Sequence, residues 1–255
     1  MQLPHDKPKA FIFAGANASG KSTFITHLLN NNILNGEYIN PDNILFEKKL
    51  GYTKENYLSI GFPEAERRRN DAVEHNKDFI METVFSTDGK VNFVEDLLEK
   101  GYHVTVFFTG TSSHYTNAIY LTARVEGGGH DVPIAKLITR REKGFKNIAK
   151  FISRNICLIF VDNSVIEEPP TIVSSYTSGI PCYVNTKHDR EEYIKEWLNP
   201  ITNDIATSDD VKIPEEIYEA HREFCTSIQE KSSNFEKTLQ KDFTEKSQIL
   251  SEQYV

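Results

Sequence analysis

Cysteine is scarce in this sequence and forms no recognisable pattern. The chain has 255 residues but only three cysteines, Cys157, Cys182 and Cys225, which lie far apart. An odd and scattered set gives neither a disulfide framework nor the spacing of a metal site. We therefore expect a protein of a reducing compartment, the cytoplasm.

Long apolar runs and an excess of positive charge are also lacking. No segment approaches the length that crosses a membrane, and residues 1–9 have no apolar core of a signal peptide. The 29 lysines and arginines stand against 37 acidic residues, which leaves a net charge of −8. We therefore expect no membrane association and no broad nucleic-acid surface, while a local basic patch at a phosphate site stays compatible with this charge.

The sequence does contain a complete phosphate-binding loop. Residues 10–14 (AFIFA) are typical of a buried strand, and residues 24–29 have apolar side chains at helical spacing. Between them lies the pattern GxxxxGK[ST] with every fixed position filled: Gly15, Ala16, Asn17, Ala18, Ser19, Gly20, Lys21, Ser22 and Thr23. Its glycines let successive N–H groups turn toward an anion, Lys21 brings a charge to the phosphates, and the Ser22 hydroxyl is placed to ligate Mg²⁺. A strand before the loop and a helix after it favour ATP and Mg²⁺ binding over a chance glycine turn.

Two carboxylates follow short predicted strands. Asp42 comes after a strand at residues 37–40, because Pro41 cannot continue a ladder, and ligands bind at this edge of open α/β sheets. A catalytic base and a helix N-cap are equally good interpretations of Asp42. Glu82 closes a strand predicted at residues 78–84, and we expect it in the cleft because burying an unpaired carboxylate is costly. An exposed edge-strand glutamate is the alternative.

Glycines and arginines occur together in the middle of the chain. A central strand is predicted at residues 103–109, and a hydroxyl-rich loop follows it at its end. Three glycines at 127–129 then separate Arg124 from a basic helix predicted at residues 134–149. Because such glycines add no packing, we interpret them as a hinge that lowers arginines onto phosphates. A surface loop beside a basic helix is the alternative.

An arginine triplet at residues 67–69 lies in a helix predicted at residues 62–77. Read alone, it looks like a nucleic-acid contact. Acidic residues surround it on both sides, and they are Glu64, Glu66, Asp71 and Glu74. This mixture favours a solvated helix face.

The remaining segments complete an α/β pattern. We predict a core strand at residues 156–161, a loop at 165–177, an edge strand at 180–185 and a helix at 189–198. The composition changes at about residue 200, where a polar linker precedes a charged, helix-prone stretch at 214–254 to which we attach no chemistry. The expected fold class is α/β, with a P-loop NTPase/kinase-like domain at residues 1–200, a mostly parallel central sheet flanked by helices, and a helical C-terminal extension at residues 201–255.

Taken together, these stretches resemble the zeta-toxin-like P-loop kinases, the family that includes bacterial UDP-N-acetylglucosamine kinases of toxin–antitoxin systems. The matching segments are GANASGKST at 15–23, YINPDNI at 38–44, FIMETVFS at 79–86, GYHVTVFFTGTSS at 101–113, RVEGGGHDVPIAKLITRREKGFKNI at 124–148 and DNS at 162–164. The resemblance spans about residues 10–185, and the GGHDVP segment between arginines is more specific than the P-loop. The sequence looks most like the compact branch described as predicted ATPases, so the resemblance implies the fold more firmly than the substrate.

The resemblance also implies roles for the matching residues. Lys21 and Ser22 would hold the ATP phosphates and Mg²⁺, and Asp42 would deprotonate the substrate hydroxyl. The residues that would line the acceptor pocket are Glu82, Thr83, Thr109 and Thr111; those that would clamp the transferring phosphoryl group are Arg124 and Arg141, with Arg140 a close alternative on the cofactor side. Lys143 stands where relatives often carry arginine, so a bidentate phosphate contact is not assured there.

These observations predict an ATP-dependent small-molecule kinase that phosphorylates a hydroxyl, by resemblance that of a sugar nucleotide such as UDP-N-acetylglucosamine, with an antitoxin protein as a candidate partner. One alternative is a P-loop kinase or nucleotidyl transferase that acts on a nucleoside, a cofactor or a nucleic-acid end. Another is a nucleotide-gated module that binds a partner through its tail. In that case Asp42, Glu82 and the lid arginines would be superfluous.

Overall fold

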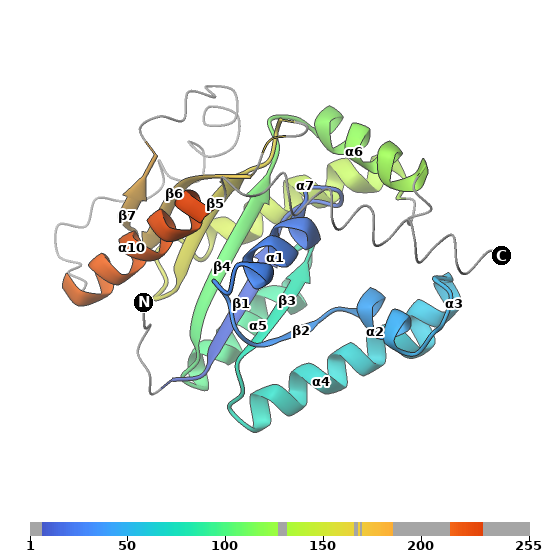
Figure 1. Ribbon diagram of the computed structural model, residues 1–255, viewed down its shortest axis with the longest axis horizontal. Helices are drawn as coiled ribbons and strands as arrows, with labels where there is room; N and C mark the ends of the chain where they lie inside the picture. The colour runs from blue at the N-terminus through green and yellow to red at the C-terminus, as the bar shows by residue number, and fades with distance from the viewer. Residues whose placement is uncertain (1–6, 127–131, 166–167, 169, 186–214, 232–255) are drawn as a thin grey trace.

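A seven-stranded sheet runs through the centre of the protein, with helices on both of its faces (Figure 1). The structure is a computed structural model that describes residues 7–126, 132–165, 168, 170–185 and 215–231. Within those ranges no helix is both long and apolar enough to cross a membrane.

Strands and helices alternate along most of the chain. The strands are β1 (Lys9–Ala14), β2 (Glu37–Ile39), β3 (Phe79–Thr83), β4 (His103–Gly110), β5 (Cys157–Asp162), β6 (Thr171–Thr177) and β7 (Ile180–Val184). The helices are α1 (Lys21–Asn30), α2 (Pro41–Glu47), α3 (Lys54–Asn56), the π-helix η1 (Tyr57–Gly61), α4 (Phe62–Glu74), α5 (Asp88–Glu99), α6 (His114–Glu126), α7 (Ile134–Ala149) and α10 (Glu215–Lys231).

The sheet has a parallel part and an antiparallel part. Its strand order is β2-β3-β1-β4-β5-β6-β7, and all neighbours from β2 to β5 are parallel. Parallel neighbours need helical crossovers, which explains the alternation of strands and helices in the sequence. The predicted fold class, α/β with a mostly parallel central sheet flanked by helices, is confirmed.

Two apolar cores cover the two faces of the sheet. Along β1, Phe11 and Phe13 belong to one core and Ile12 to the other, as alternation along a strand requires. Helices α1 and α10 cover the first face, whereas α4, α5 and α7 contribute to the second. Because both faces are buried, the central strands are continuous apolar runs, which is why they could be recognised from the sequence.

The antiparallel part corrects one prediction. Residues 165–177 were expected to be a loop, but residues 171–177 form β6, which pairs with β5 on one side and β7 on the other. The β6–β7 turn consists of Ser178 and Gly179, both with positive φ (52° and 82°), as a two-residue hairpin requires. The prediction of an edge strand containing Pro181 is confirmed, since β7 lies at the end of the sheet.

Helix α10 packs against β6 and β7 and completes the first core (Figure 1). Its Phe224 and Ile228 are buried, and the Phe224 ring lies 6.2 Å from that of Phe107 in β4. The helix expected at residues 189–198, the boundary proposed near residue 200 and the tail beyond residue 231 lie outside the described residues.

Candidate functional site

The carboxyl ends of three adjacent parallel strands bring the candidate residues together. Strand β1 lies between β3 and β4, so the P-loop that follows β1 is next to the end of β3, where Glu82 stands. Strand β2 pairs with the outer side of β3, and α2 with Asp42 follows β2 directly. The order of strands, rather than proximity in sequence, creates the site.

The two P-loop glycines are required by close contacts as well as by backbone geometry. Gly15 has a φ of 146°, and a Cβ there would lie 2.1 Å from the carbonyl oxygen of Thr109. Gly20 has a φ of 84°, and a Cβ there would lie 2.2 Å from the side-chain nitrogen of Asn163. Any other residue at either position would be strained and would displace its neighbour.

Side-chain amides from two distant segments hold the loop from outside. Asn163 donates to the carbonyl oxygen of Ser19 at 3.1 Å, and Asn117 of α6 donates to that of Ala18 at 3.4 Å. The amide oxygen of Asn117 accepts from the Thr111 hydroxyl at 2.9 Å, which fixes its orientation. These contacts satisfy loop carbonyls without using the N–H groups that a P-loop turns toward an anion.

Lys21 is the one cationic residue of the P-loop, and it is buried. Its ammonium group donates to the carbonyl oxygens of Gly15 at 3.1 Å and Ala16 at 2.8 Å, and the residue is only 8% exposed. Burial lowers the pKa of Lys21 to about 8, Glu82 acts against that fall, and Arg124 adds to it. A lysine with a lowered pKa in this position gains from a nearby polyanion, which would restore its charge.

Glu82 links the P-loop to the second strand end. It accepts from the Ser22 hydroxyl at 2.8 Å and from the Asn40 amide at 2.6 Å. The same Asn40 amide lies 2.9 Å from the Tyr38 hydroxyl, and burial, aided by Glu82, raises the pKa of that tyrosine. Glu82 therefore has hydrogen-bond partners in the site. It is not an exposed glutamate of an edge strand, because β3 lies between β2 and β1.

Asp42 lies in the first turn of α2 but is not its cap. The cap is Asn40, whose side-chain oxygen accepts from the Asp42 N–H at 2.7 Å, so the Asp42 carboxylate is not used for capping. One of its oxygens lies 3.8 Å from the guanidinium of Arg124. Burial raises the pKa of Asp42, Arg124 opposes that rise and Glu82 supports it. Of the two interpretations of Asp42, the N-cap is wrong.

The two arginines of α7 reach the P-loop side. Arg140 donates to the side-chain oxygen of Asn17 at 3.2 Å, and Arg141 donates to the carbonyl oxygen of Thr111 at 2.7 Å while lying over the Phe145 ring. The helix expected at residues 134–149 has the same bounds in the structure. The glycines expected to form a hinge, residues 127–129, lie outside the described residues.

Two of the three predicted pocket threonines make side-chain hydrogen bonds within the protein. The Thr83 hydroxyl accepts from the Phe85 N–H at 3.1 Å. Thr109 and Thr111 are fully buried. The Thr109 hydroxyl makes no hydrogen bond within the described residues, and the one proton of the Thr111 hydroxyl lies between the Ser113 carbonyl and the Asn117 amide oxygen, each 2.9 Å away. The structure thus places both threonines behind the P-loop, and their role in lining an acceptor pocket stays a prediction.

Two tyrosines near Asp42 were missed at the sequence level. Burial raises the pKa of Tyr57 in η1, and the charges of Asp42 and Glu82 add to this rise. Burial and Asp42 raise the pKa of Tyr52 to about 12, and its ring centroid lies 5.9 Å from that of Tyr57. No motif marks these residues, because the π-helix that positions Tyr57 has no recognisable sequence signature.

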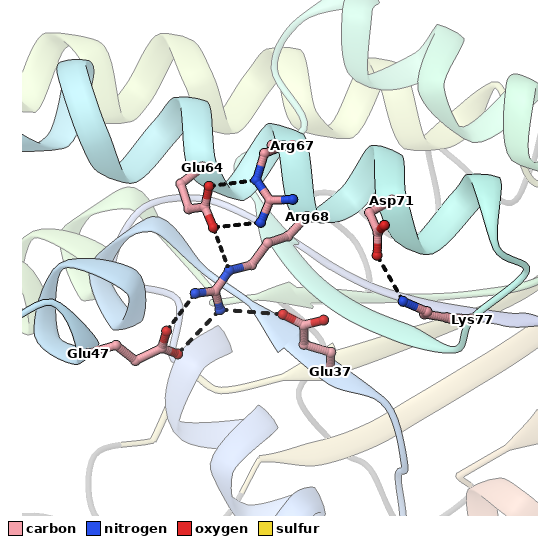
Figure 2. Close-up of polar contacts among 7 residues, drawn as sticks. All are labelled: Glu37, Glu47, Glu64, Arg67, Arg68, Asp71 and Lys77. Atoms are coloured by element: carbon pink, nitrogen blue, oxygen red, sulfur yellow. Dashed lines mark hydrogen bonds and ion pairs between the residues drawn. The ribbon is translucent and has the colours of Figure 1, made fainter.

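A network of ion pairs connects the C-terminal end of α2 with α4 and β2 (Figure 2). Arg68 of α4 donates to Glu47 of α2 at 2.7 Å, to Glu64 of its own helix at 3.1 Å and to Glu37 of β2 at 3.4 Å. Arg67 makes a two-bond contact with Glu64 at 2.8 Å. Arg67 therefore faces solvent as expected and Arg68 is partly buried among its acidic partners, but Arg69 is only 7% exposed, so the prediction of a solvated face is wrong for it.

Comparison with known proteins identifies the fold. No family model and no curated protein matches the chain. Among solved structures, the chain is similar to the AvrRxo1-ORF1:AvrRxo1-ORF2 complex with ATP, with 14% identity, 90% of this chain and 80% of that chain covered, and a TM-score of 0.56. It is also similar to the PezAT chromosomal toxin–antitoxin system of Streptococcus pneumoniae, with 12% identity, 89% of each chain covered, and a TM-score of 0.51.

Proposed function

We propose that this protein is an ATP-dependent kinase that transfers a phosphoryl group to a hydroxyl of a small molecule. The observation that carries the proposal is that a P-loop lysine, a carboxylate not used for capping and an arginine converge at one sheet edge. Lys21 and Asp42 are linked through Arg124, which lies 3.8 Å from Asp42 and electrostatically affects Lys21. A binding module would need the P-loop but not the other two groups.

Each group has a specific task in this proposal. Asp42 accepts the proton of the acceptor hydroxyl, and its raised pKa makes it a better base than an ordinary aspartate. Lys21 and Arg124 stabilise the negative charge that spreads over the transferred group. Arg140 and Arg141, which contact the P-loop residue Asn17 and the strand end at Thr111, supply further positive charge beside the phosphates.

Ser22 and Glu82 are suited to hold Mg²⁺. They offer a hydroxyl and a carboxylate 2.8 Å apart at the P-loop, and oxygen ligands of this kind are those that Mg²⁺ prefers. A bound Mg²⁺ would supply positive charge beside the phosphate oxygens. Glu82 also binds Asn40, the cap of α2, so it connects the proposed metal site with the helix that carries Asp42.

UDP-N-acetylglucosamine is the first acceptor to test. This choice rests on the resemblance of the sequence motifs and on the fold shared with the PezAT toxin–antitoxin system. Incubation of the protein with labelled ATP and a panel of sugar nucleotides, nucleosides, cofactors and oligonucleotide ends should label the sugar nucleotide. If only another acceptor were labelled, that compound would be the substrate instead of the sugar nucleotide. If no acceptor were labelled, the proposed kinase activity would be wrong.

An antitoxin protein is the partner we propose. The support is the fold shared with PezAT, which is a chromosomal toxin–antitoxin system. Such a partner would bind the folded kinase and suppress its activity. Co-expression with candidate neighbouring proteins, followed by size-exclusion chromatography and the same labelling assay, tests this.

A further inference from the structure

Two histidines meet where helix α10 packs on the sheet. The ring of His221 in α10 and the ring of His103 at the start of β4 have their centroids 5.7 Å apart. His221 is only 2% exposed, and its Nδ1 makes a hydrogen bond with the Thr177 hydroxyl of β6 at 2.6 Å. The pair therefore lies inside the contact between α10 and the strands beneath it (Figure 1).

The second nitrogen of each ring is buried without a partner. Nε2 of His103 and Nε2 of His221 make no hydrogen bond within the described ranges. A neutral imidazole leaves one polar atom unsatisfied there, whereas an imidazolium carries an N–H on both nitrogens and a positive charge as well. These surroundings therefore favour the neutral form of both rings.

The charged groups beside His103 add to this preference. Lys9 of β1 is the register partner of His103, and Asp78 is engaged with Lys9, since it accepts from the Lys9 N–H at 2.7 Å and lies 3.9 Å from the Lys9 ammonium. Burial lowers the pKa of His103 to about 4, and the charges of Lys9 and Lys7 lower it further. Burial also lowers the pKa of His221 to about 4, and His103 adds to that fall.

The other titratable groups at this contact provide no negative charge in acid. Burial raises the pKa of each of them, and they are the thiols of Cys157, Cys182 and Cys225 and the phenol of Tyr183. On α10 itself, Glu219 binds Arg222 at 2.7 Å, and Glu223 is exposed. A proton on either histidine is therefore not balanced by these groups.

We propose that His103 and His221 form an acid-sensitive latch, which holds α10 on the sheet while both imidazoles are neutral and releases it when they are protonated. Two protonated rings would place like charges 5.7 Å apart in a buried contact, with no acceptor at either Nε2 in the described chain. The inference does not depend on the proposed kinase activity.

The pH window of the latch follows from proton linkage. Release exposes both rings to water, where their pKa returns to 6.5, so the open state binds more protons than the closed state between pH 6.5 and about 4. The closed state is fully favoured above this window and is lost as pH falls through it. Each histidine raises the open-to-closed ratio by up to about tenfold per pH unit.

Thiol labelling measures the release of α10. The three cysteines of the chain are all buried at this contact: Cys225 lies one turn after His221 on α10, Cys182 lies in β7, and Cys157 is the register partner of Thr177. The rate at which a pyridyl disulfide labels the full-length protein, divided by the rate for urea-unfolded protein at the same pH, gives the open fraction. We expect this fraction to rise about tenfold or more from pH 7 to pH 5.

Three variants assign the effect to the histidines. His103→Gln combined with His221→Gln removes both titrating groups, so labelling corrected in this way should become nearly independent of pH. His103→Gln alone keeps the contact between His221 and Thr177, and it should leave the smaller rise of a single histidine. His75→Gln is the matched control, because His75 is exposed beside Asp71, and its rise should equal that of wild type.

Two results would overturn the inference: a constant open fraction in wild type between pH 7 and pH 5, or the same rise in wild type and in the double variant. If the double variant is labelled rapidly at pH 7, its α10 is already released, and His103→Gln alone decides, since an unchanged rise in it would reject the latch. Hydrogen exchange at pH 5, followed by mass spectrometry, separates local release from global unfolding. Strands β1 and β3 should stay protected while α10 exchanges, and equal loss of protection in all three would reject the latch.

Discussion

The two sides of the candidate site are built in different ways. On the nucleotide side, the P-loop is held by its own backbone and by the side-chain amides of Asn117 and Asn163, its Gly15 lies close to the Thr109 carbonyl, and Lys21 is 8% exposed. On the acceptor side, the side chains of Asp42 and Arg124 are each 39% exposed, and α2 is held by solvent-facing ion pairs of Arg68. The nucleotide side is a buried backbone structure, whereas the acceptor side is assembled from side chains.

This difference has a physical consequence. Buried backbone contacts cannot be rearranged without strain, so the nucleotide side has one geometry. Exposed ion pairs contribute about 0–1 kcal/mol each and are screened by salt, so the acceptor side can adjust at little cost. In evolution, such a site would keep its nucleotide-binding geometry while the residues on its acceptor side change.

The largest effect is expected from the acceptor side, where the proposed base stands. Asp42→Asn should reduce turnover about 10²–10⁴-fold while leaving the affinity for ATP nearly unchanged, because the carboxylate acts on the acceptor. Steady-state kinetics and calorimetry with ATP measure the two quantities. Asp71→Asn is the control, since that carboxylate is exposed and pairs with Lys77 (Figure 2). Equal turnover in Asp42→Asn and wild type would remove Asp42 from the mechanism.

The next effect concerns the rigidity of the nucleotide side. Gly15→Ala should lower the free energy of unfolding by about 2–4 kcal/mol, because its Cβ meets a strand carbonyl. Gly20→Ala should cost only about 1–2 kcal/mol, since the Asn163 side chain can move away. Gly89→Ala, where a Cβ meets nothing within 4 Å, is the control and should be neutral or stabilising. Urea denaturation compares them, and equal costs for Gly15 and Gly89 would contradict the contact argument.

The third effect is a pH dependence that arises from Lys21. Its pKa is 10.5 in an unfolded chain and about 8 in the folded protein, so the unfolded chain holds more protons between these values. The stability of the ligand-free protein gains from this group as pH rises from 8 to 10.5. Nucleotide binding favours the ammonium form, so affinity should fall above pH 8 by up to about tenfold per unit.

Calorimetry in buffers of different ionisation enthalpy measures this effect. At pH 8.5 we expect ATP binding to take up a fraction of a proton, and Lys21→Met should abolish the uptake. Zero proton uptake by the wild-type protein at this pH would show that Lys21 is already fully charged before the nucleotide binds.

The smallest effect is expected from the ion pairs that hold α2. Arg68→Lys keeps the charge but loses the two-pronged contact with Glu47, so the KM for the acceptor should rise a few-fold at low salt and return toward that of wild type at high salt. Arg222→Lys in α10, which breaks a similar exposed pair with Glu219, should leave the KM unchanged. A fall in kcat without a change in KM would show that Arg68 does not act by positioning α2.

The nucleotide side could be predicted from the sequence because its requirements are local. The spacing of Gly15, Gly20 and Lys21 specifies a backbone conformation, and the strand and helix beside it have continuous apolar patterns. The helix at residues 134–149 was predicted with its observed bounds.

The parts that were missed depend on tertiary contacts. Strand β6 follows two prolines and contains Ser174 and Ser175, both buried, so its polarity resembles that of a loop. Arg69 shares its segment with exposed charges, and only the packing of α4 distinguishes it from Arg67. The choice between base and cap for Asp42 required the observation that Asn40 takes the cap.

The packing of helix α10 affects when the protein can fold during its synthesis. Its Phe224 covers Phe107, which stacks at 4.5 Å on Phe13, the residue that also contacts Phe24 of the P-loop helix. A nascent chain that has emerged from the ribosome only as far as β7 would carry the entire P-loop yet leave this aromatic stack open to water. Nucleotide-binding competence should therefore arrive late in biosynthesis, when a segment about 200 residues downstream of Lys21 has been translated.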